Sequence, residues 1–323
     1  MIANSGEYRK KNGQRGYVMM NNFIFENKTK VYFGKGGVKE YLGGLLANFG
    51  ETVMLAYGGG SIKCNGVYDE IMGILNAQGK CVVEFSGIMS NPTYAKVQEG
   101  AKLARENHVD LILAVGGGSV SDCCKVISGA FDTLSHAMET YFGKPDENNL
   151  SDDINEAVMR SVIRNIRILL TDPENYDARS ELAQASAMAE NGVLKIGKVT
   201  DFQAHQIQHQ LGAYTDCNHG AGLAVIHPVL YRHIYKSGAA RFTRWAQNVW
   251  GIAPKGSDEE TAAAGIDALA AFIKEIGLLT TFTELGIPAD TDFHAVADST
   301  NITAGCCKKL TRDEICEILQ EYL

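Results

Sequence analysis

The 323-residue sequence has no long apolar run. Its longest uncharged apolar stretches are Leu111–Val115 and Ala221–Leu230, and His227 interrupts the second. Both are shorter than the roughly 20 residues that a helix needs to cross a bilayer, so we expect no membrane partner. Residues 1–19 also lack the apolar segment of a signal peptide, and we expect them to form a disordered leader.

Positive charge is scarce as well. The chain carries 30 lysines and arginines against 38 acidic residues, which gives a formal net charge of −8 and a pI near 5.5. Such a chain repels nucleic acid and anionic membranes, so we expect neither as a partner. The eight cysteines are scattered without a C-x-x-C pair, and a disulfide framework is uncommon at this length. These features predict a protein of the reducing cytoplasm.

The remaining composition is that of a globular protein. An apolar content of 45% in 323 residues supports two domains with a core each, and it excludes disordered, collagen-like and coiled-coil chains. Between residues 20 and 115, short apolar runs lead through glycine-rich turns into segments of helical periodicity. The runs are Lys30–Phe33, Thr52–Tyr57, Cys81–Phe85 and Leu111–Val115. This alternation predicts a parallel sheet whose strands are buried on both faces by helices.

No convincing strand follows Ser119. The rest of the sequence shows the three- and four-residue apolar spacing of helices, divided by proline and glycine. We therefore predict an incomplete Rossmann-like α/β domain at residues 20–128 and an all-helical domain at residues 129–323. Val120–Tyr141 contains Gly129 as its only helix breaker, so the pattern also allows one helix across this boundary.

Two glycine clusters directly follow predicted strands. Gly116-Gly117-Gly118-Ser119 follows Leu111–Val115, and Asp122 lies just beyond it where a helix is predicted to begin. Bare backbone N–H groups at such a point can hold a pyrophosphate. A tight turn with positive φ would also require glycine, and this alternative stays open.

The other cluster bears on the choice of nucleotide. Gly58-Gly59-Gly60-Ser61 and then Lys63 follow the strand at Thr52–Tyr57, where NAD-selective folds place an acid on the ribose hydroxyls. No acid stands here. The small residues and Lys63 leave room and charge for a 2′-phosphate, which predicts NADP(H) over NAD(H). The alternative is an ordinary loop with a solvated lysine.

Three of the histidines belong to pairs of residues spaced one helical turn apart. Asp132 and His136 are four residues apart, as are His205 and His209, so each pair lies on one face of a predicted helix. His219 follows in the loop that opens the next helix. One carboxylate and three imidazoles suit Fe²⁺ or Zn²⁺ better than Mg²⁺ or Ca²⁺.

Spacing alone leaves the metal site partly open. It does not decide which of His205 and His209 is a ligand, and any single Asp–His pair is also common as a surface ion pair. His227, which precedes Pro228, is a further and weaker candidate.

The sequence resembles the iron-containing (group III) alcohol dehydrogenases, in particular the butanol-dehydrogenase-like branch. The shared motifs run in order from Met20 to Leu323: Lys30–Gly37 (KVYFGKGG), Tyr57–Lys63, Gly87–Pro92 (GIMSNP), Gly116–Lys125, Gly129–Tyr141, His205–Gly220 and His227-Pro228.

This resemblance assigns roles to the candidate residues. It implies metal ligation by Asp132, His136, His205 and His219, with His209 as a nearby active-site histidine. It also implies that the glycine clusters contact the nucleotide phosphates and that Asn91-Pro92 lines the same cleft. A homodimer is the expected assembly.

One part of the family pattern is missing. Between Ser128 and Gly129 the family carries several tens of further residues, including a T-A-x-x-T-G-S-E type segment on the nicotinamide side of the pocket. A dinucleotide fold also needs a second half beyond its first strands, and no strand follows Val115. We therefore expect either an internal deletion or residues absent from the sequence as printed.

These features predict an enzyme that interconverts primary alcohols and aldehydes with NADP(H). The metal acts as a Lewis acid on the substrate oxygen, and His209 relays the proton. Two alternatives stay open. The first is a non-catalytic, metal-binding remnant of the family that has lost the nicotinamide-side segment. The second is a metal-dependent hydrolase or lyase that uses the same ligands without a nucleotide.

Overall fold

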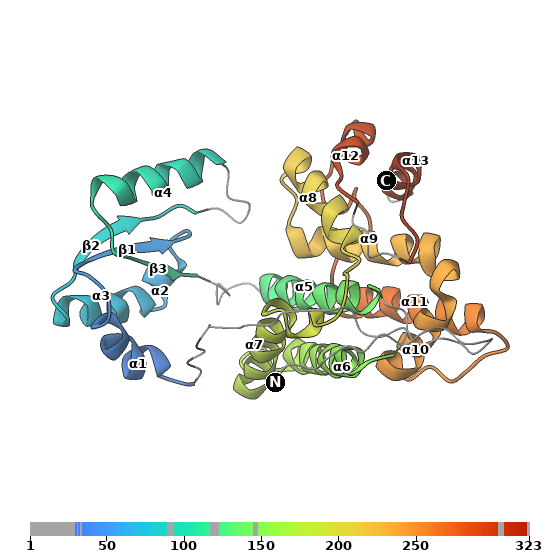
Figure 1. The fold of residues 1–323 in the computed structure, drawn as a ribbon, viewed down its shortest axis with the longest axis horizontal. Helices are drawn as coiled ribbons and strands as arrows, with labels where there is room; N and C mark the ends of the chain where they lie inside the picture. Colours follow the sequence, from blue (N-terminus) through green and yellow to red (C-terminus); the bar gives the residue numbers. More distant parts are fainter. Residues whose placement is uncertain are drawn as a thin grey trace, which may run out of the picture.

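The computed structural model describes residues 30, 32, 34–88, 94–116, 123–144, 148–302 and 307–321. An α/β part comes first in the chain and a helical part follows, as the sequence predicts (Figure 1). The α/β part contains α1 Gly37–Leu46, β1 Thr52–Tyr57, α2 Ser61–Cys64, α3 Val67–Ala77, β2 Cys81–Phe85, α4 Tyr94–Glu106 and β3 Leu111–Val115. The helical part contains α5 Cys123–Tyr141, α6 Leu150–Thr171, α7 Tyr176–Glu190, η1 Val193–Lys195, α8 Gln203–Thr215, α9 His219–Ile234, η2 Tyr235–Gly238, α10 Ala239–Trp250, α11 Asp258–Glu275, α12 Phe293–Ser299 and α13 Arg312–Gln320.

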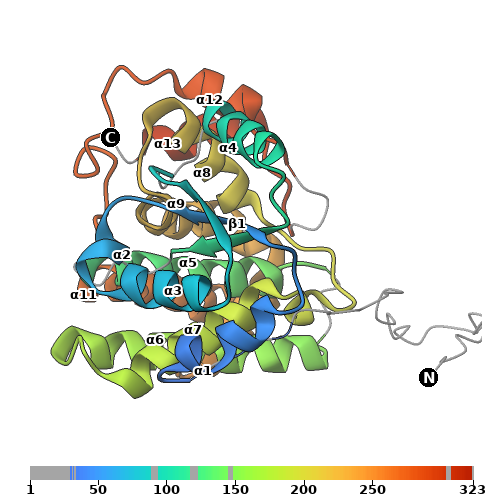
Figure 2. The same ribbon diagram turned by 90° about the vertical axis from the view of Figure 1, so that its left-hand side faces the viewer.

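The sheet is parallel, with strand order β2-β1-β3. On one face, Leu55 of β1 packs with Leu75 of α3 in a cluster that also includes residues of α1 and α2. On the other face, Met54 and Phe85 pack against Leu103 of α4. The helices therefore cover both faces of the sheet, and Figure 2 shows α3 and α4 on opposite sides of β1. The predicted fold class is confirmed.

β3 differs from the prediction of a strand buried on both faces. Leu111, Leu113 and Val115 pack against the cluster on one face, whereas Ile112 and Ala114 are exposed, Ile112 at 60%. β3 is the edge strand, and within the described residues no further strand pairs with it. An apolar sequence typical of a central strand thus lies at the margin of the sheet.

The first predicted strand is not formed at its described positions. Lys30 and Tyr32 lie outside any strand, while Val31 and Phe33, like the leader at residues 1–19, are outside the described residues. Gly129 does not end a helix, because α5 is continuous from Cys123 to Tyr141. The domain boundary predicted after Ser128 falls within this helix.

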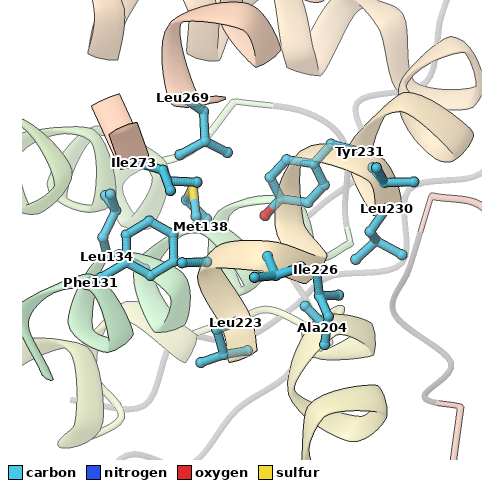
Figure 3. Close-up of a cluster of buried hydrophobic side chains, with 14 of the residues drawn as sticks. Phe131, Leu134, Met138, Ala204, Leu223, Ile226, Leu230, Tyr231, Leu269 and Ile273 are labelled. Carbon is cyan, nitrogen blue, oxygen red and sulfur yellow. The ribbon is translucent and has the colours of Figure 1, made fainter. Parts of the chain in front are cut away.

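The core of the helical part surrounds α9. Twelve of the 16 residues of this helix are buried, as expected for a helix that is apolar on most sides. In Figure 3, Leu223, Ile226, Leu230 and Tyr231 of α9 lie among Phe131, Leu134 and Met138 of α5, Ala204 of α8, and Leu269 and Ile273 of α11. This packing fixes α5, α8 and α9 against one another. None of the described helices has the length and apolar content required to cross a membrane.

Candidate active site

Three helices bring the predicted metal ligands together. α5 carries Asp132 and His136 one turn apart, α8 carries His205, and α9 begins at His219. The side chain of Asn218 caps α9 by accepting a hydrogen bond from a backbone N–H of its first turn. This cap fixes the helix start and, with it, the position of His219.

The ligand atoms of these residues surround Asp132 Oδ1. The Nε2 atoms of His205, His219 and His136 lie 3.3, 3.4 and 3.7 Å from this oxygen. Nε2 of His136 is 3.0 Å from Nε2 of His205. The ligand atoms of Asp132, His205 and His219 all lie within 4.8 Å of one another. The structure thus brings Asp132, His205 and His219 into one cluster, and it places His136 beside Asp132 and His205.

This arrangement fits a divalent cation. Asp132 Oδ1 is buried and accepts no hydrogen bond from the described residues. A buried acceptor without a hydrogen bond lowers the stability of the fold unless a cation interacts with it. Ligand atoms about 2.1 Å from one ion lie about 3.0 to 3.4 Å apart, close to the separations found here. One carboxylate and three imidazoles are a donor set for Fe²⁺ or Zn²⁺.

The charges of the site depend on one another. Burial acts to raise the pKa of the Asp132 carboxyl, but the imidazoles of His205 and His219 hold that pKa well below its usual range. Burial acts to lower the pKa of His205, but the carboxylates of Glu139 and Asp132 outweigh burial and raise the pKa to about 9. A metal ion needs the imidazole lone pair, so His205 must release a proton when the ion binds.

Glu139 is a site residue that the sequence analysis did not identify. Its fully buried carboxylate accepts a hydrogen bond from Nδ1 of His205 and another, at 2.6 Å, from the backbone N–H of Ala204. A carboxylate on the second nitrogen of a metal-binding histidine fixes the ring and raises its basicity. Glu139 follows His136 by three residues on α5, so helical spacing was a usable signal.

Gln208 plays the corresponding part for His219. It is buried on α8, and its side-chain oxygen accepts a hydrogen bond from Nδ1 of His219. With Nδ1 engaged, Nε2 of His219 is the nitrogen that faces Asp132. No sequence spacing links Gln208 to His219, because their contact depends on how α8 packs against α9.

The two remaining candidate histidines have different surroundings. His209 is exposed, and its ring stacks on that of His219 with centroids 5.2 Å apart. Partial burial and the charge of His219 lower the pKa of His209. His227 is fully buried with its Nε2 2.6 Å from Ser135 Oγ, and burial lowers its pKa to about 4. The geometry therefore favours His209 over His227 as a proton relay.

The α/β part places two glycines at neighbouring strand ends. Tyr57 of β1 and Val115 of β3 pair in register, so Gly58 and Gly116 leave the sheet next to each other. The chain passes from β1 to β2 on one side and then crosses to β3 on the other. In open α/β sheets, ligands bind at such a switch point, beyond the carboxyl ends of the strands.

Neither backbone conformation nor close packing explains Gly59, Gly60 and Gly116. Gly59, Gly60 and Gly116 do not have positive φ, and a Cβ atom added to any of them would meet no atom within 4 Å. A tight turn that needs glycine is therefore not what the described structure shows at these positions, and the backbone is open to close approach by a ligand. The other predicted nucleotide-binding residues Asn91, Pro92, Gly117, Gly118, Ser119 and Asp122 lie outside the described residues.

Lys63 follows the first glycine cluster on α2, which begins at Ser61. Its Nζ lies 3.5 Å from Glu84 Oε2 and 4.6 Å from the ring centroid of Tyr68, while its side chain is 48% exposed. The hydroxyls of Tyr57 and Tyr68 donate hydrogen bonds to the two oxygens of Glu84 at 2.5 and 2.6 Å. Lys63 thus has an exposed charge with a defined position beside the glycine cluster.

Comparison with known families identifies the chain. The description of iron-containing alcohol dehydrogenases matches residues 28–157, and that of the C-terminal part of the Fe-containing alcohol dehydrogenase family matches residues 126–323. The chain belongs to the iron-containing alcohol dehydrogenase family. The resemblance found in the sequence is confirmed, and the protein is an enzyme of this kind.

Relatives in the iron-containing alcohol dehydrogenase family match most of the chain. The probable NADH-dependent butanol dehydrogenase 2 of Bacillus subtilis is 30% identical over 94% of this chain and 100% of its own length. The NADPH-dependent aldehyde reductase YqhD of Escherichia coli is 27% identical over 83% of this chain and 90% of its own length. The crystal structure of NADH-dependent butanol dehydrogenase A from Thermotoga maritima has a TM-score of 0.87 at 26% identity, covering 94% of this chain and 99% of that one.

The alignment with the Bacillus subtilis relative is longer than this chain. It spans 395 positions, whereas the chain has 323 residues. Part of that iron-containing alcohol dehydrogenase therefore has no counterpart here.

Proposed function

We propose that this protein interconverts primary alcohols and aldehydes with NADP(H) at a divalent ion, Fe²⁺ by preference, held by Asp132, His136, His205 and His219. The observation that carries the proposal is the convergence of three imidazole nitrogens on the buried oxygen of Asp132. Similarity to butanol dehydrogenases and to an aldehyde reductase supports the substrate class. A homodimer in the cytoplasm is part of the proposal.

When bound, the ion would supply positive charge that lowers the pKa of the alcohol, and the nicotinamide would accept the hydride. The residues of the chain orient the reacting groups and move the proton. Glu139 and Gln208 hold the Nδ1 atoms of His205 and His219, so both rings present Nε2 to the same point. His209, exposed beside His219, passes the proton of the alcohol to solvent. Its lowered pKa keeps its imidazole neutral, and able to accept a proton, at neutral pH.

The nucleotide occupies the switch point of the sheet. Gly59, Gly60 and Gly116 offer their open backbone to its phosphates, and Lys63 offers its charge to the 2′-phosphate. Glu84 near the end of β2 is the kind of acid that binds ribose hydroxyls in NAD-selective folds. Here both of its oxygens already accept tyrosine hydroxyls, which favours NADP(H).

A rate assay tests this function directly. Protein loaded with Fe²⁺ is expected to oxidise NADPH when butanal is added, to lose this activity on chelation, and to recover it when the ion is restored. NADPH absorbance and metal content are measured on the same samples. Turnover of an ester or other hydrolysable substrate without nicotinamide would instead support the hydrolase or lyase alternative.

Lys63→Ala tests the nucleotide assignment. Loss of one charged contact to the 2′-phosphate removes about 1.5 to 3 kcal/mol, so the KM for NADPH is expected to rise roughly 10- to 100-fold. The KM for NADH and the metal content should not change, because NADH has no 2′-phosphate. Lys102→Ala serves as the control, since this exposed lysine lies on α4 and pairs with Glu106. Equal losses with NADPH and NADH would contradict the assignment.

The exposed side of β3 favours one alternative, a non-catalytic remnant of the family. Ile112 is 60% exposed on an edge strand whose sequence suits the middle of a sheet. We infer that the residues without a counterpart would cover this side and follow Ser128. Under this alternative, the purified protein binds the metal ion but butanal causes no oxidation of NADPH.

A further inference from the structure

Glu190, the last residue of α7, lies beside the metal ligands although it belongs to none of the helices that carry them. Its Oε1 is 2.9 Å from Nε2 of His136, and its side chain is 51% exposed. It also interacts electrostatically with Asp132. No motif or spacing in the sequence pointed to Glu190, because its approach to His136 depends on how α7 packs against α5.

The position of Glu190 matches that of a ligand. Two atoms bound to one ion at about 2.1 Å lie about 3.0 Å apart at right angles and about 3.4 Å apart in a tetrahedron. His136 Nε2 is 3.0 Å from His205 Nε2 and 2.9 Å from Glu190 Oε1. The carboxylate of Glu190, paired with His136, is therefore about as far from His136 Nε2 as the proposed ligand His205 is.

Metal binding would also change the hydrogen bond of Glu190. His136 can bind an ion through Nε2 only without a proton there, so it can no longer donate to Glu190. Glu190 Oε1 would then lie within about 5 Å of the ion, since the metal–nitrogen bond is about 2.1 Å and the gap to the carboxylate is 2.9 Å.

We propose that Glu190 is a second carboxylate ligand of the metal centre. The inference rests on the proposed function, in which Asp132, His136, His205 and His219 hold a divalent ion. With Glu190, the set becomes three imidazoles and two carboxylates. Five donors favour ions that accept six ligands, such as Fe²⁺ and Co²⁺, over four-coordinate Zn²⁺. The second negative charge strengthens cation binding and weakens the ion as a Lewis acid.

The test is a titration of the full chain, stripped of metal, with Co²⁺. Glu190→Gln keeps the side-chain shape and a hydrogen-bond acceptor for His136 but removes the charge. We expect the Kd for Co²⁺ to rise roughly tenfold or more. We also expect the visible absorption of bound Co²⁺ to intensify, because that absorption strengthens as the coordination number falls. Glu181→Gln on the same helix is the matched control, since its carboxylate contacts Ser161 and Arg164 and should leave Kd and spectrum unchanged.

Each outcome of the titration has a defined meaning. An unchanged Kd in Glu190→Gln overturns the proposal, and so does a higher Kd with an unchanged spectrum, because a nearby charge alone would explain that result. A higher Kd together with a stronger spectrum supports it. If the unaltered protein binds no Co²⁺, the metal centre itself is refuted, and that failure is distinct from normal binding that does not depend on Glu190.

Discussion

His219→Ala is expected to leave the protein folded but unable to retain its divalent ion. The substitution removes the one proposed ligand on α9, whose Nε2 lies 3.4 Å from Asp132 Oδ1. Loss of a residue that merely supports a ligand costs roughly 10- to 100-fold in metal affinity, so loss of the ligand itself should cost more than 100-fold. NADPH oxidation by butanal should fall below detection. Metal content after dialysis, the rate and a thermal melt are measured together.

The control for this variant lies on the same helix. His233→Ala removes an imidazole near the other end of α9, where its Nε2 is 3.4 Å from Glu321 Oε1 and far along the helix from the metal ligands. We expect its metal content and rate to match those of the unaltered protein. A His219→Ala protein that keeps one tightly bound ion per chain would show that the ligand set is wrong, whatever happens to the rate.

Helical spacing predicted much of this site because two of its proposed ligands share α5. Asp132 and His136 are one turn apart, and the same periodicity extends to Glu139, so one helix face contains two ligands and the partner of a third. Spacing did not separate His205 from His209. In the structure His205 is buried against Glu139 and Asp132, whereas His209 is exposed, so packing distinguishes two residues that the sequence treats alike.

No spacing in the sequence predicted the residues that reach the site from other helices. Gln208 reaches His219 across the α8–α9 contact, and Glu190 reaches His136 from the end of α7. Such contacts depend on helix packing, which local periodicity does not encode. The prediction that β3 is buried on both faces was wrong for a related reason. Its apolar residues are typical of a central strand, but Ile112 is exposed because β3 is the edge of the described sheet.

Asp152→Asn is expected to cause the largest loss of stability. The fully buried carboxylate of Asp152 on α6 accepts hydrogen bonds from Lys198 and, at 2.5 Å, from Arg241, whose side chains are 0% and 5% exposed. Both cations also donate to the carbonyl oxygen of Tyr141, the last residue of α5. Removing the charge of Asp152 takes away the buried carboxylate that both of these buried cations contact. Breaking a buried ion pair in this way costs about 3 to 5 kcal/mol in the free energy of unfolding.

The neighbouring residue provides the control for the Asp152 prediction. Asp153 also pairs with an arginine, Arg244, at 2.5 Å, but its side chain is 64% exposed. An exposed pair contributes about 0 to 1 kcal/mol, so Asp153→Asn should change the free energy of unfolding in urea by no more than that. Similar losses in the two variants would mean that burial is not what makes Asp152 important. Lys198 and Arg241, which contact Asp152, also hold the end of α5, the helix that carries Asp132 and His136. We therefore expect Asp152→Asn to weaken metal binding as well, whereas Asp153→Asn should not.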